Sequence, residues 1–314
     1  MTKHILPLVC LFISMTIFTE AQNFSSTDIT INRYIDGTLL APESVENPQL
    51  VIMIAGSGPT DRNGNQSFMR NDMLKKLAEK LSENGVATFR YDKRVVKQLK
   101  TGTFDNNIRF DDFVTDAKSV VTYFKSSYAS ITIAGHSQGS LVGLLAADAG
   151  VNSFISLAGA GNSIDQIILE QITKTAPFFT EDTKRVLEIL KNGETTTEFP
   201  PALASIFSLD IQPFMSNWMQ YNPQKLIERL EIPVLIINGT KDLQVSTAEA
   251  QLLKAHKKDA ELVIIENMNH LLFEISGDDL ENTKSYNEMN HPVMPKVISV
   301  ILNFIKKDKS TIEK

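Results

Sequence analysis

Short apolar runs alternate with longer amphipathic segments along most of the chain. The run at residues 50–56 is continuously apolar and ends at a glycine, as expected for a central strand buried on both faces. Further runs of strand length lie at residues 86–91, 131–134, 151–159, 233–240 and 261–268. Apolar spacing predicts helices at residues 72–85, 111–128, 141–150, 247–258 and 295–307. The alternation predicts an α/β fold in which a mainly parallel sheet carries helices on both faces.

Two segments depart from this alternation. Residues 28–42 predict two short strands joined at Asp36-Gly37. Residues 163–230 contain helical patterns but no convincing strand, which predicts a helical insertion in the domain. The insertion either packs on the core or caps the mouth of a site. It is rich in large apolar side chains: Phe178, Phe179, Phe207, Phe214, Met215, Trp218 and Met219.

The first residues have the pattern of a secretory signal peptide. A basic start precedes an apolar stretch over residues 5–18, and Ala21 offers a small residue for cleavage. The alternative, a membrane anchor, would need roughly 20 apolar residues. A lipoprotein signal would need a small residue directly before Cys10, where the chain has valine. We therefore expect residues 1–21 to be removed, leaving a secreted or periplasmic domain at residues 22–314 without a stable membrane anchor.

The composition argues against several classes of function. A chain of 314 residues with 42% hydrophobic content can bury a substantial core. Its net charge of −6 gives no electrostatic reason to expect a nucleic acid as a partner. The chain has no G-x-x-x-x-G-K-[ST] phosphate loop, and its five histidines and single cysteine are too scattered for a metal site. We expect no metal centre and no nucleotide chemistry, and the sequence predicts no oligomeric state.

The stretch ITIAGHSQGSLVG, residues 131–143, places Ser137 between a predicted strand and a predicted helix. Gly135 and Gly139 stand two residues before and after it. In this strand–turn–helix motif a sharp turn exposes a nucleophilic serine, and small residues let the strand and the helix pass closely. A hydroxyl becomes a good nucleophile beside a base and beside donors for the oxyanion. The alternative is a glycine-rich turn with an unreactive serine.

The base and its acid partner are expected after the late strands, in the chain order serine, acid, histidine. Asp242 follows the strand predicted at 233–240, and His270 follows the strand predicted at 261–268. We expect Asp242 to orient the imidazole and His270 to take the serine proton. Other residues of the same types compete for these roles. Asp210 lies in the insertion, and His291 also follows the last predicted strand. His256 lies in a lysine-rich helix, and His136 stands beside the serine in sequence, which points its side chain elsewhere.

Two backbone N–H groups are expected to bind the oxyanion. Gln138 stands at the start of a helix, where its N–H has no intrahelical partner. The loop after the strand at 50–56 contains Gly56-Ser57-Gly58, and the motif places such a loop over the nucleophile. We expect Ser57 to supply the second N–H, with Gly56 and Gly58 allowing the backbone to approach the substrate. The alternative is an ordinary Gly/Pro turn.

Six segments together resemble the α/β-hydrolase superfamily, and within it the EstD-like branch of bacterial serine esterases: IDGTLLAP, AGSGPTDRNGN, FRYDKR, GHSQGS, NGTKDLQV and NMNHLLF. The resemblance extends from about Asp28 to the C-terminus. It implies hydrolysis of carboxylic esters through an acyl-enzyme, without a cofactor. The chain departs from the pattern after RYDKR, where Arg94-Val95-Val96-Lys97 replaces a glycine-containing turn. This departure predicts a reshaped loop beside the pocket.

These observations predict a secreted or periplasmic serine esterase that acts on a small-molecule ester. Phe214 and Trp218 are expected to contact the substrate and to limit it to short acyl chains. A serine aminopeptidase or a thioesterase would use the same triad. An aminopeptidase would also need carboxylates for a substrate ammonium, and the insertion offers Glu170, Glu181, Asp182 and Glu188. A non-catalytic binding protein that keeps the fold is the remaining alternative.

Overall fold

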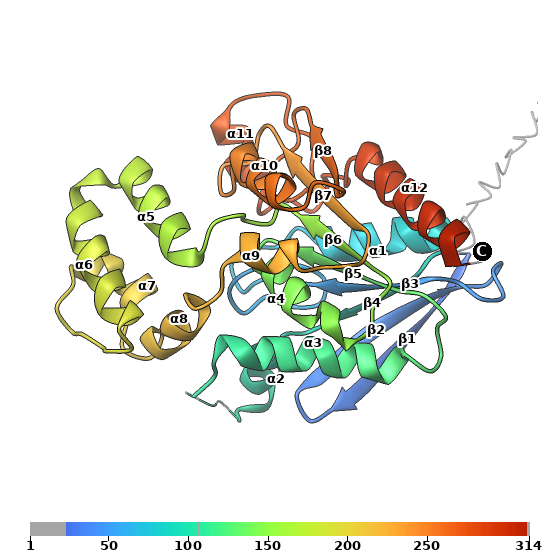
Figure 1. Ribbon diagram of the computed structural model, residues 1–314, viewed down its shortest axis with the longest axis horizontal. Helices are drawn as coiled ribbons and strands as arrows, with labels where there is room; N and C mark the ends of the chain where they lie inside the picture. The colour runs from blue at the N-terminus through green and yellow to red at the C-terminus, as the bar shows by residue number, and fades with distance from the viewer. Residues whose placement is uncertain (1–22, 104, 106, 313–314) are drawn as a thin grey trace, which may run out of the picture.

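The computed structural model describes residues 23–103, 105 and 107–312 (Figure 1). The signal peptide expected at residues 1–21 lies outside these residues, and its removal stays a prediction. Across the described part of the chain, no helix combines the length and the apolar character that a membrane span requires.

An eight-stranded sheet runs through the molecule in the order β1-β2-β4-β3-β5-β6-β7-β8. Its strands are β1 (Phe24–Asn32), β2 (Ile35–Pro42), β3 (Leu50–Ile54), β4 (Ala87–Tyr91), β5 (Ile131–His136), β6 (Ser153–Leu157), β7 (Val234–Gly239) and β8 (Glu261–Ile265). β2 pairs antiparallel with β1 and β4, whereas all pairs from β4 to β8 are parallel. The mainly parallel sheet is therefore confirmed. The carboxyl ends of its parallel strands meet at one edge, where ligands bind in such folds.

Helices cover both faces of the sheet (Figure 1). One face carries α1 (Met73–Glu83) and α12 (Pro295–Ile312), and the other carries α3 (Phe110–Phe124), α4 (Gln138–Ala146) and α10 (Thr247–His256). In β3, Leu50 and Ile52 belong to the core beneath α3 and α4, whereas Val51 and Met53 belong to the core beneath α1 and α12. Successive side chains of a strand point to opposite faces, so a strand between two cores is apolar at every position.

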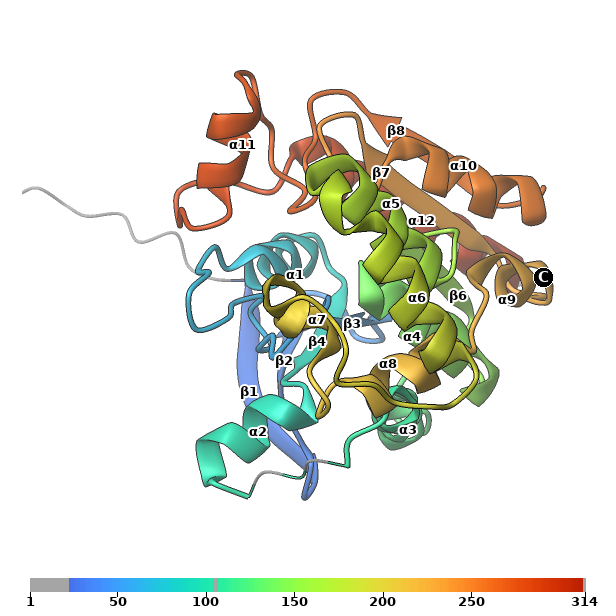
Figure 2. The ribbon, with the colours of Figure 1, turned by 90° about the vertical axis from the view of Figure 1, so that its left-hand side faces the viewer.

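Between β6 and β7 the chain is helical, as its sequence predicts. The elements are α5 (Ile164–Thr175), α6 (Thr180–Lys191), α7 (Ala204–Phe207), α8 (Gln212–Trp218) and α9 (Pro223–Glu228), with short 3₁₀ turns among them. α5, α6 and α7 stand away from the sheet, while α9 returns to it (Figures 1 and 2). α8 joins the insertion to the core, since Trp218 stacks on Phe110 of α3 with ring centroids 5.4 Å apart.

Two helices are not predicted from the sequence: α2 (Arg94–Thr101) and α11 (Asp279–Ser285). α2 forms where the chain lacks the glycine-containing turn, so the reshaped loop expected beside the pocket is a helix. The Arg94 guanidinium anchors its first turn to α3 through Asp112 at 2.6 Å and Asp116 at 2.8 Å. The contact is tertiary, which explains why local sequence patterns do not reveal this helix.

Candidate active site

Ser137 stands in the turn between β5 and α4, at the carboxyl edge of the sheet. Its backbone has φ 54° and ψ −119°, a conformation that a residue with a side chain keeps only where its surroundings impose it. The Ser137 N–H donates to the Leu157 carbonyl of β6, and the Ser137 carbonyl accepts from the Ser140 N–H, both at 2.9 Å. This strained turn is the geometry expected of the nucleophile motif.

Gly135 and Gly139 are required because β3, β5 and α4 approach one another closely at this turn. A Cβ atom at Gly135 would lie 2.2 Å from the Gly139 carbonyl oxygen. A Cβ atom at Gly139 would lie 2.3 Å from the Ile54 carbonyl oxygen. Side chains do not fit at either position, so the two glycines permit the turn that lifts Ser137 above the sheet.

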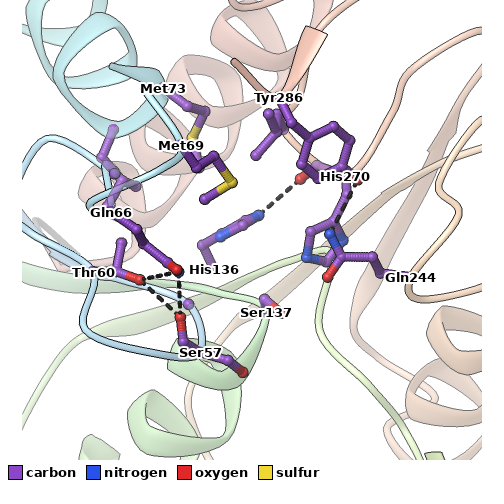
Figure 3. A pocket seen from close by; sticks show the side chains of 14 residues that line it. Ser57, Thr60, Gln66, Met69, Met73, His136, Ser137, Gln244, His270 and Tyr286 are labelled. Carbon is purple, nitrogen blue, oxygen red and sulfur yellow. Dashed lines mark hydrogen bonds between the residues drawn. The ribbon is translucent and has the colours of Figure 1, made fainter. Parts of the chain in front are cut away.

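Asp242 and His270 come together from the loops that follow β7 and β8. Asp242 Oδ2 accepts from His270 Nδ1 at 2.8 Å, and both side chains are almost completely buried. Asp242 Oδ1 accepts from the backbone N–H groups of Gln244 and Val245 at 2.8 and 2.9 Å, which fixes the carboxylate. Because Nδ1 carries the proton that Asp242 accepts, Nε2 of His270 is the basic nitrogen. His270 and Ser137 line the same cavity (Figure 3).

The other acids and histidines weighed from the sequence lie elsewhere or have other contacts. His136 Nε2 lies 2.8 Å from the His270 carbonyl oxygen. A carbonyl only accepts, so His136 donates and fixes the backbone of His270. Burial lowers the pKa of His136 to about 3, so it stays neutral. The remaining candidates have no contact with the Asp242–His270 pair: His291 bonds Glu288 at 2.7 Å, His256 lies 3.8 Å from Glu228, and Asp210 is exposed in the insertion.

The loop after β3 lies directly over the candidate nucleophile. A Cβ atom at Gly56 would lie only 3.3 Å from Ser137 Cβ. The Ser57 carbonyl accepts from Thr60 Oγ1 at 2.7 Å and from Gln66 Nε2 at 2.9 Å, which braces the loop (Figure 3). Within the described chain, the N–H groups of Ser57 and Gln138 donate to no other residue. Two backbone donors beside Ser137 are therefore available to an oxygen anion.

Three cavities meet at this point. The His270 chamber, about 200 Å³, has polar and methionine side chains in its wall, among them Thr60, Gln66, Met69, Gln244 and Tyr286 (Figure 3). The insertion chamber, about 240 Å³, contains Ser137, Gln138, Ile164, Ile167 and Trp218. The apolar chamber, about 370 Å³, reaches Ser57, Gly58 and Gln138, and most of its wall is apolar: Val95, Phe113, Phe214, Met215 and Trp218. Two exposed carboxylates, Asp105 and Asp210, also line it. Only the first of the three is lined by His270.

The large apolar residues of the insertion divide into three groups. Phe214, Met215 and Trp218 line the apolar chamber, so the two residues expected to contact substrate do face a cavity. Phe207 is completely buried in the core, whereas Phe178 is 89% exposed. Hydrophobic character alone does not separate these environments, because the exposure of each side chain depends on which face of its short helix packs against other elements.

One buried basic residue beside the site is not predicted from the sequence. Lys93 follows β4, and its Nζ donates to the Gly56 carbonyl and to Gln138 Oε1. The only sequence signal was its position in the segment FRYDKR, directly after an apolar strand.

Comparison with known proteins agrees with the fold and with the motifs. No protein-family model matches the chain. Its sequence is 24% identical to the esterase EstD of Thermotoga maritima over 302 residues, which cover 92% of this chain and 69% of that protein. Est1E from Butyrivibrio proteoclasticus has a similar structure, with a TM-score of 0.55 at 20% identity over 90% of this chain and 99% of that one. For the Pyrococcus furiosus esterase Pf2001 the TM-score is 0.53 at 15% identity, over 90% and 91% of the two chains. The chain therefore has the α/β-hydrolase fold and is similar to the EstD esterase, as its motifs predict.

Proposed function

We propose that this protein is a serine hydrolase that cleaves carboxylic esters. The observation that carries the proposal is that the strained Ser137 shares a cavity with His270, which the buried Asp242 accepts from. Two unengaged backbone N–H groups lie beside the same serine. The similarity to an esterase supports the ester as the bond that is cleaved.

The proposed reaction gives each proton and bond a place among the residues of the site. Ser137 Oγ attacks the ester carbonyl carbon while His270 Nε2 takes the hydroxyl proton, and Asp242 stabilises the imidazolium. The N–H groups of Ser57 and Gln138 donate to the oxyanion. His270 then returns the proton to the alcohol oxygen, which leaves an acyl group on Ser137. Water attacks this acyl-enzyme in the same way and releases the acid and the free serine.

From the position of the proposed general acid we infer that the two halves of the ester occupy different chambers. The alcohol oxygen must lie within hydrogen-bond reach of His270, so the alcohol occupies the chamber that His270 lines. The acyl group then lies on the opposite side, past Gln138, in the insertion and apolar chambers. We assign the acyl chain to the apolar chamber because its wall, formed by Val95, Phe214 and Trp218, is the more continuous apolar surface.

Acyl chain length provides the first test of this assignment. Each methylene that enters an apolar pocket contributes about 0.8 kcal/mol, so kcat/KM should rise about fourfold per carbon until the chamber is filled. We expect the optimum at roughly two to six carbons by the same transfer argument. Phe214→Ala and Trp218→Ala enlarge the chamber and should shift the optimum towards longer chains. The measurement is kcat/KM for p-nitrophenyl esters from acetyl to decanoyl.

The matched control is Phe178→Ala, which removes an aromatic ring of the same insertion that lines none of the three chambers. Phe214→Ala is the cleaner of the two chamber variants. Both side chains pack on Phe110, but Trp218 is buried and Phe214 only half-buried, so loss of Trp218 weakens the core more. An unchanged chain-length profile in both chamber variants would show that the insertion does not bind the acyl group.

An aminopeptidase or a thioesterase with the same residues is the alternative. The acidic side chains considered for an ammonium site, Glu170, Glu181, Asp182 and Glu188, line none of the three chambers. Among the described residues, no carboxylate side chain lines either chamber that contains Ser137. A substrate ammonium would therefore lack a counter-charge beside the nucleophile.

The bond preference is tested by comparing p-nitrophenyl acyl esters and acyl thioesters with aminoacyl p-nitroanilides. We expect kcat/KM for the esters to exceed that for the anilides by at least about 100-fold, because the two chambers that contain Ser137 offer a substrate ammonium no carboxylate. Equal or faster cleavage of the anilides would replace the esterase assignment with a peptidase.

A further inference from the structure

Lys93 is buried beside the loop that follows β3, with 4% of its surface exposed. Its Nζ donates to three oxygen atoms: the Gly56 carbonyl at 2.5 Å, the Gly58 carbonyl at 3.3 Å and Gln138 Oε1 at 2.6 Å. The same nitrogen lies 4.7 Å from the centre of the Phe113 ring. An ammonium has three N–H donors, so these three acceptors use all of them.

No carboxylate of the described chain pairs with this ammonium. Its neighbours in sequence are both paired: Asp92 with Arg62 at 3.0 Å and Arg94 with Asp116 at 2.8 Å. Burial lowers the pKa of Lys93 to about 7. A lysine that stays buried without a counter-charge is unfavourable for stability, and such residues concentrate at functional sites.

The three acceptors belong to the two segments that supply the proposed oxyanion donors. The Gly56 carbonyl and the Ser57 N–H are the two ends of one planar trans peptide, so they point in opposite directions. An ammonium on the Gly56 oxygen therefore directs the Ser57 N–H away from Lys93. It also polarises that N–H, since hydrogen bonds in series strengthen one another. The bond to Gln138 ties the loop to the residue that carries the second donor.

We propose that Lys93 is a positioning residue whose ammonium holds the Gly56–Ser57 peptide and Gln138 so that both N–H groups face the oxyanion. The inference rests on the proposed ester hydrolysis and assigns no bond-making step to Lys93. The oxyanion exists only after the serine has attacked, so loss of this support should lower kcat and leave KM nearly unchanged.

The test compares Lys93→Met and Lys93→Ala with Lys118→Met, a control on α3 whose lysine pairs with Asp148 at the surface. Rates on p-nitrophenyl acetate are expressed per active site that reacts to completion with a fluorophosphonate. We expect Lys93→Met to lower kcat about 10- to 100-fold, less than the loss of an oxyanion donor itself, with KM within about threefold of wild type. The control should keep the wild-type values.

Chemical rescue separates the charge from the volume of the side chain. Lys93→Ala removes the atoms of n-propylammonium, so this cation should restore kcat of the variant in a saturable manner. The neutral 1-propanol has nearly the same size but cannot donate to three acceptors, and it should restore nothing.

The pH dependence of kcat is a further measurement. The other titratable groups on the elements around Lys93 are paired or neutral. Asp92 pairs with Arg62 and Lys100, and Asp112 and Asp116 pair with Arg94. His136 stays neutral, and His270 pairs with Asp242. With a pKa of about 7, Lys93 is charged below this pH and neutral above it. Turnover should therefore fall as the pH rises through about 7, and Lys93→Met should lack this decline.

The outcomes distinguish this inference from the function on which it rests. Wild-type protein that neither hydrolyses the ester nor reacts with the probe would overturn the proposed function, and the role of Lys93 with it. If the wild type is active, an unchanged kcat per active site in Lys93→Met overturns the role of Lys93 alone. The same holds if activity falls only in proportion to the number of reactive sites, or if 1-propanol rescues as well as the cation, because either result makes the side chain structural.

Discussion

Ser137→Ala is expected to lower kcat/KM for p-nitrophenyl acetate by at least about 10⁴-fold, because the nucleophile and its base act as a unit. The substitution removes one hydroxyl and leaves the backbone contacts to Leu157 and Ser140 in place, so the thermal stability should hardly change. Wild-type protein should also form a fluorophosphonate adduct that peptide mass mapping places on Ser137, and the variant should form none.

The control is Ser140→Ala, which removes the same group one turn further along α4. The Ser140 hydroxyl is bonded to the Ser156 hydroxyl at 2.8 Å and faces none of the three chambers. This variant should remain active and reactive with the probe. An adduct on another residue, or turnover that survives in Ser137→Ala, would remove Ser137 from the mechanism.

Asp242→Asn should lower kcat about 10⁴-fold at neutral pH while KM and stability stay close to wild type. The asparagine oxygen can still accept from the N–H groups of Gln244 and Val245, which keeps the loop in place. Its NH₂ group then faces His270 Nδ1, which must become an acceptor. The imidazole proton moves to Nε2, and that nitrogen can no longer take the proton of Ser137.

Asp148→Asn is the matched control, since Asp148 pairs with Lys118 on the exposed surface far from the three chambers. It should have wild-type kcat. The measurements are steady-state kinetics and thermal unfolding of both variants. Activity of Asp242→Asn within about tenfold of wild type would mean that His270 is oriented by other contacts, such as the bond from His136 to its carbonyl.

The predictions from the sequence were strongest where one physical cause determines the pattern. β3 is apolar at every position because it has a core on each face. This pattern alone predicts that the segment is a strand and that it lies in the middle of the sheet. The expected positions of Ser137, Asp242 and His270 also followed from topology, since each comes directly after a strand whose carboxyl end lies at one edge of the sheet. The prediction that these three residues form one site rested on their order in the chain. In the structure, Asp242 is hydrogen-bonded to His270.

The features that escaped prediction depend on contacts between distant segments. α2 is a short, mostly polar helix whose first residue is held by two carboxylates of α3. Lys93 meets acceptors that stand 35 to 45 positions away in the chain, and nothing in its local sequence indicates them. In the insertion, Phe178 and Phe207 have the same hydrophobicity and opposite environments, so composition could not rank them.

The segments of the candidate site follow four separate strands, and this determines when the site can form during folding. The first candidate residue, Ser57, follows β3, and the last, His270, follows β8 at the edge of the sheet. Contacts between residues so far apart in sequence form slowly, because the intervening chain must be ordered first. A nascent or truncated chain that lacks β8 and the loop after it carries Ser137 without the proposed base, His270. If the proposed mechanism holds, hydrolysis begins only after β8 and the His270 loop have joined the sheet, so recovery of turnover during refolding reports the assembly of the sheet as far as its β8 edge.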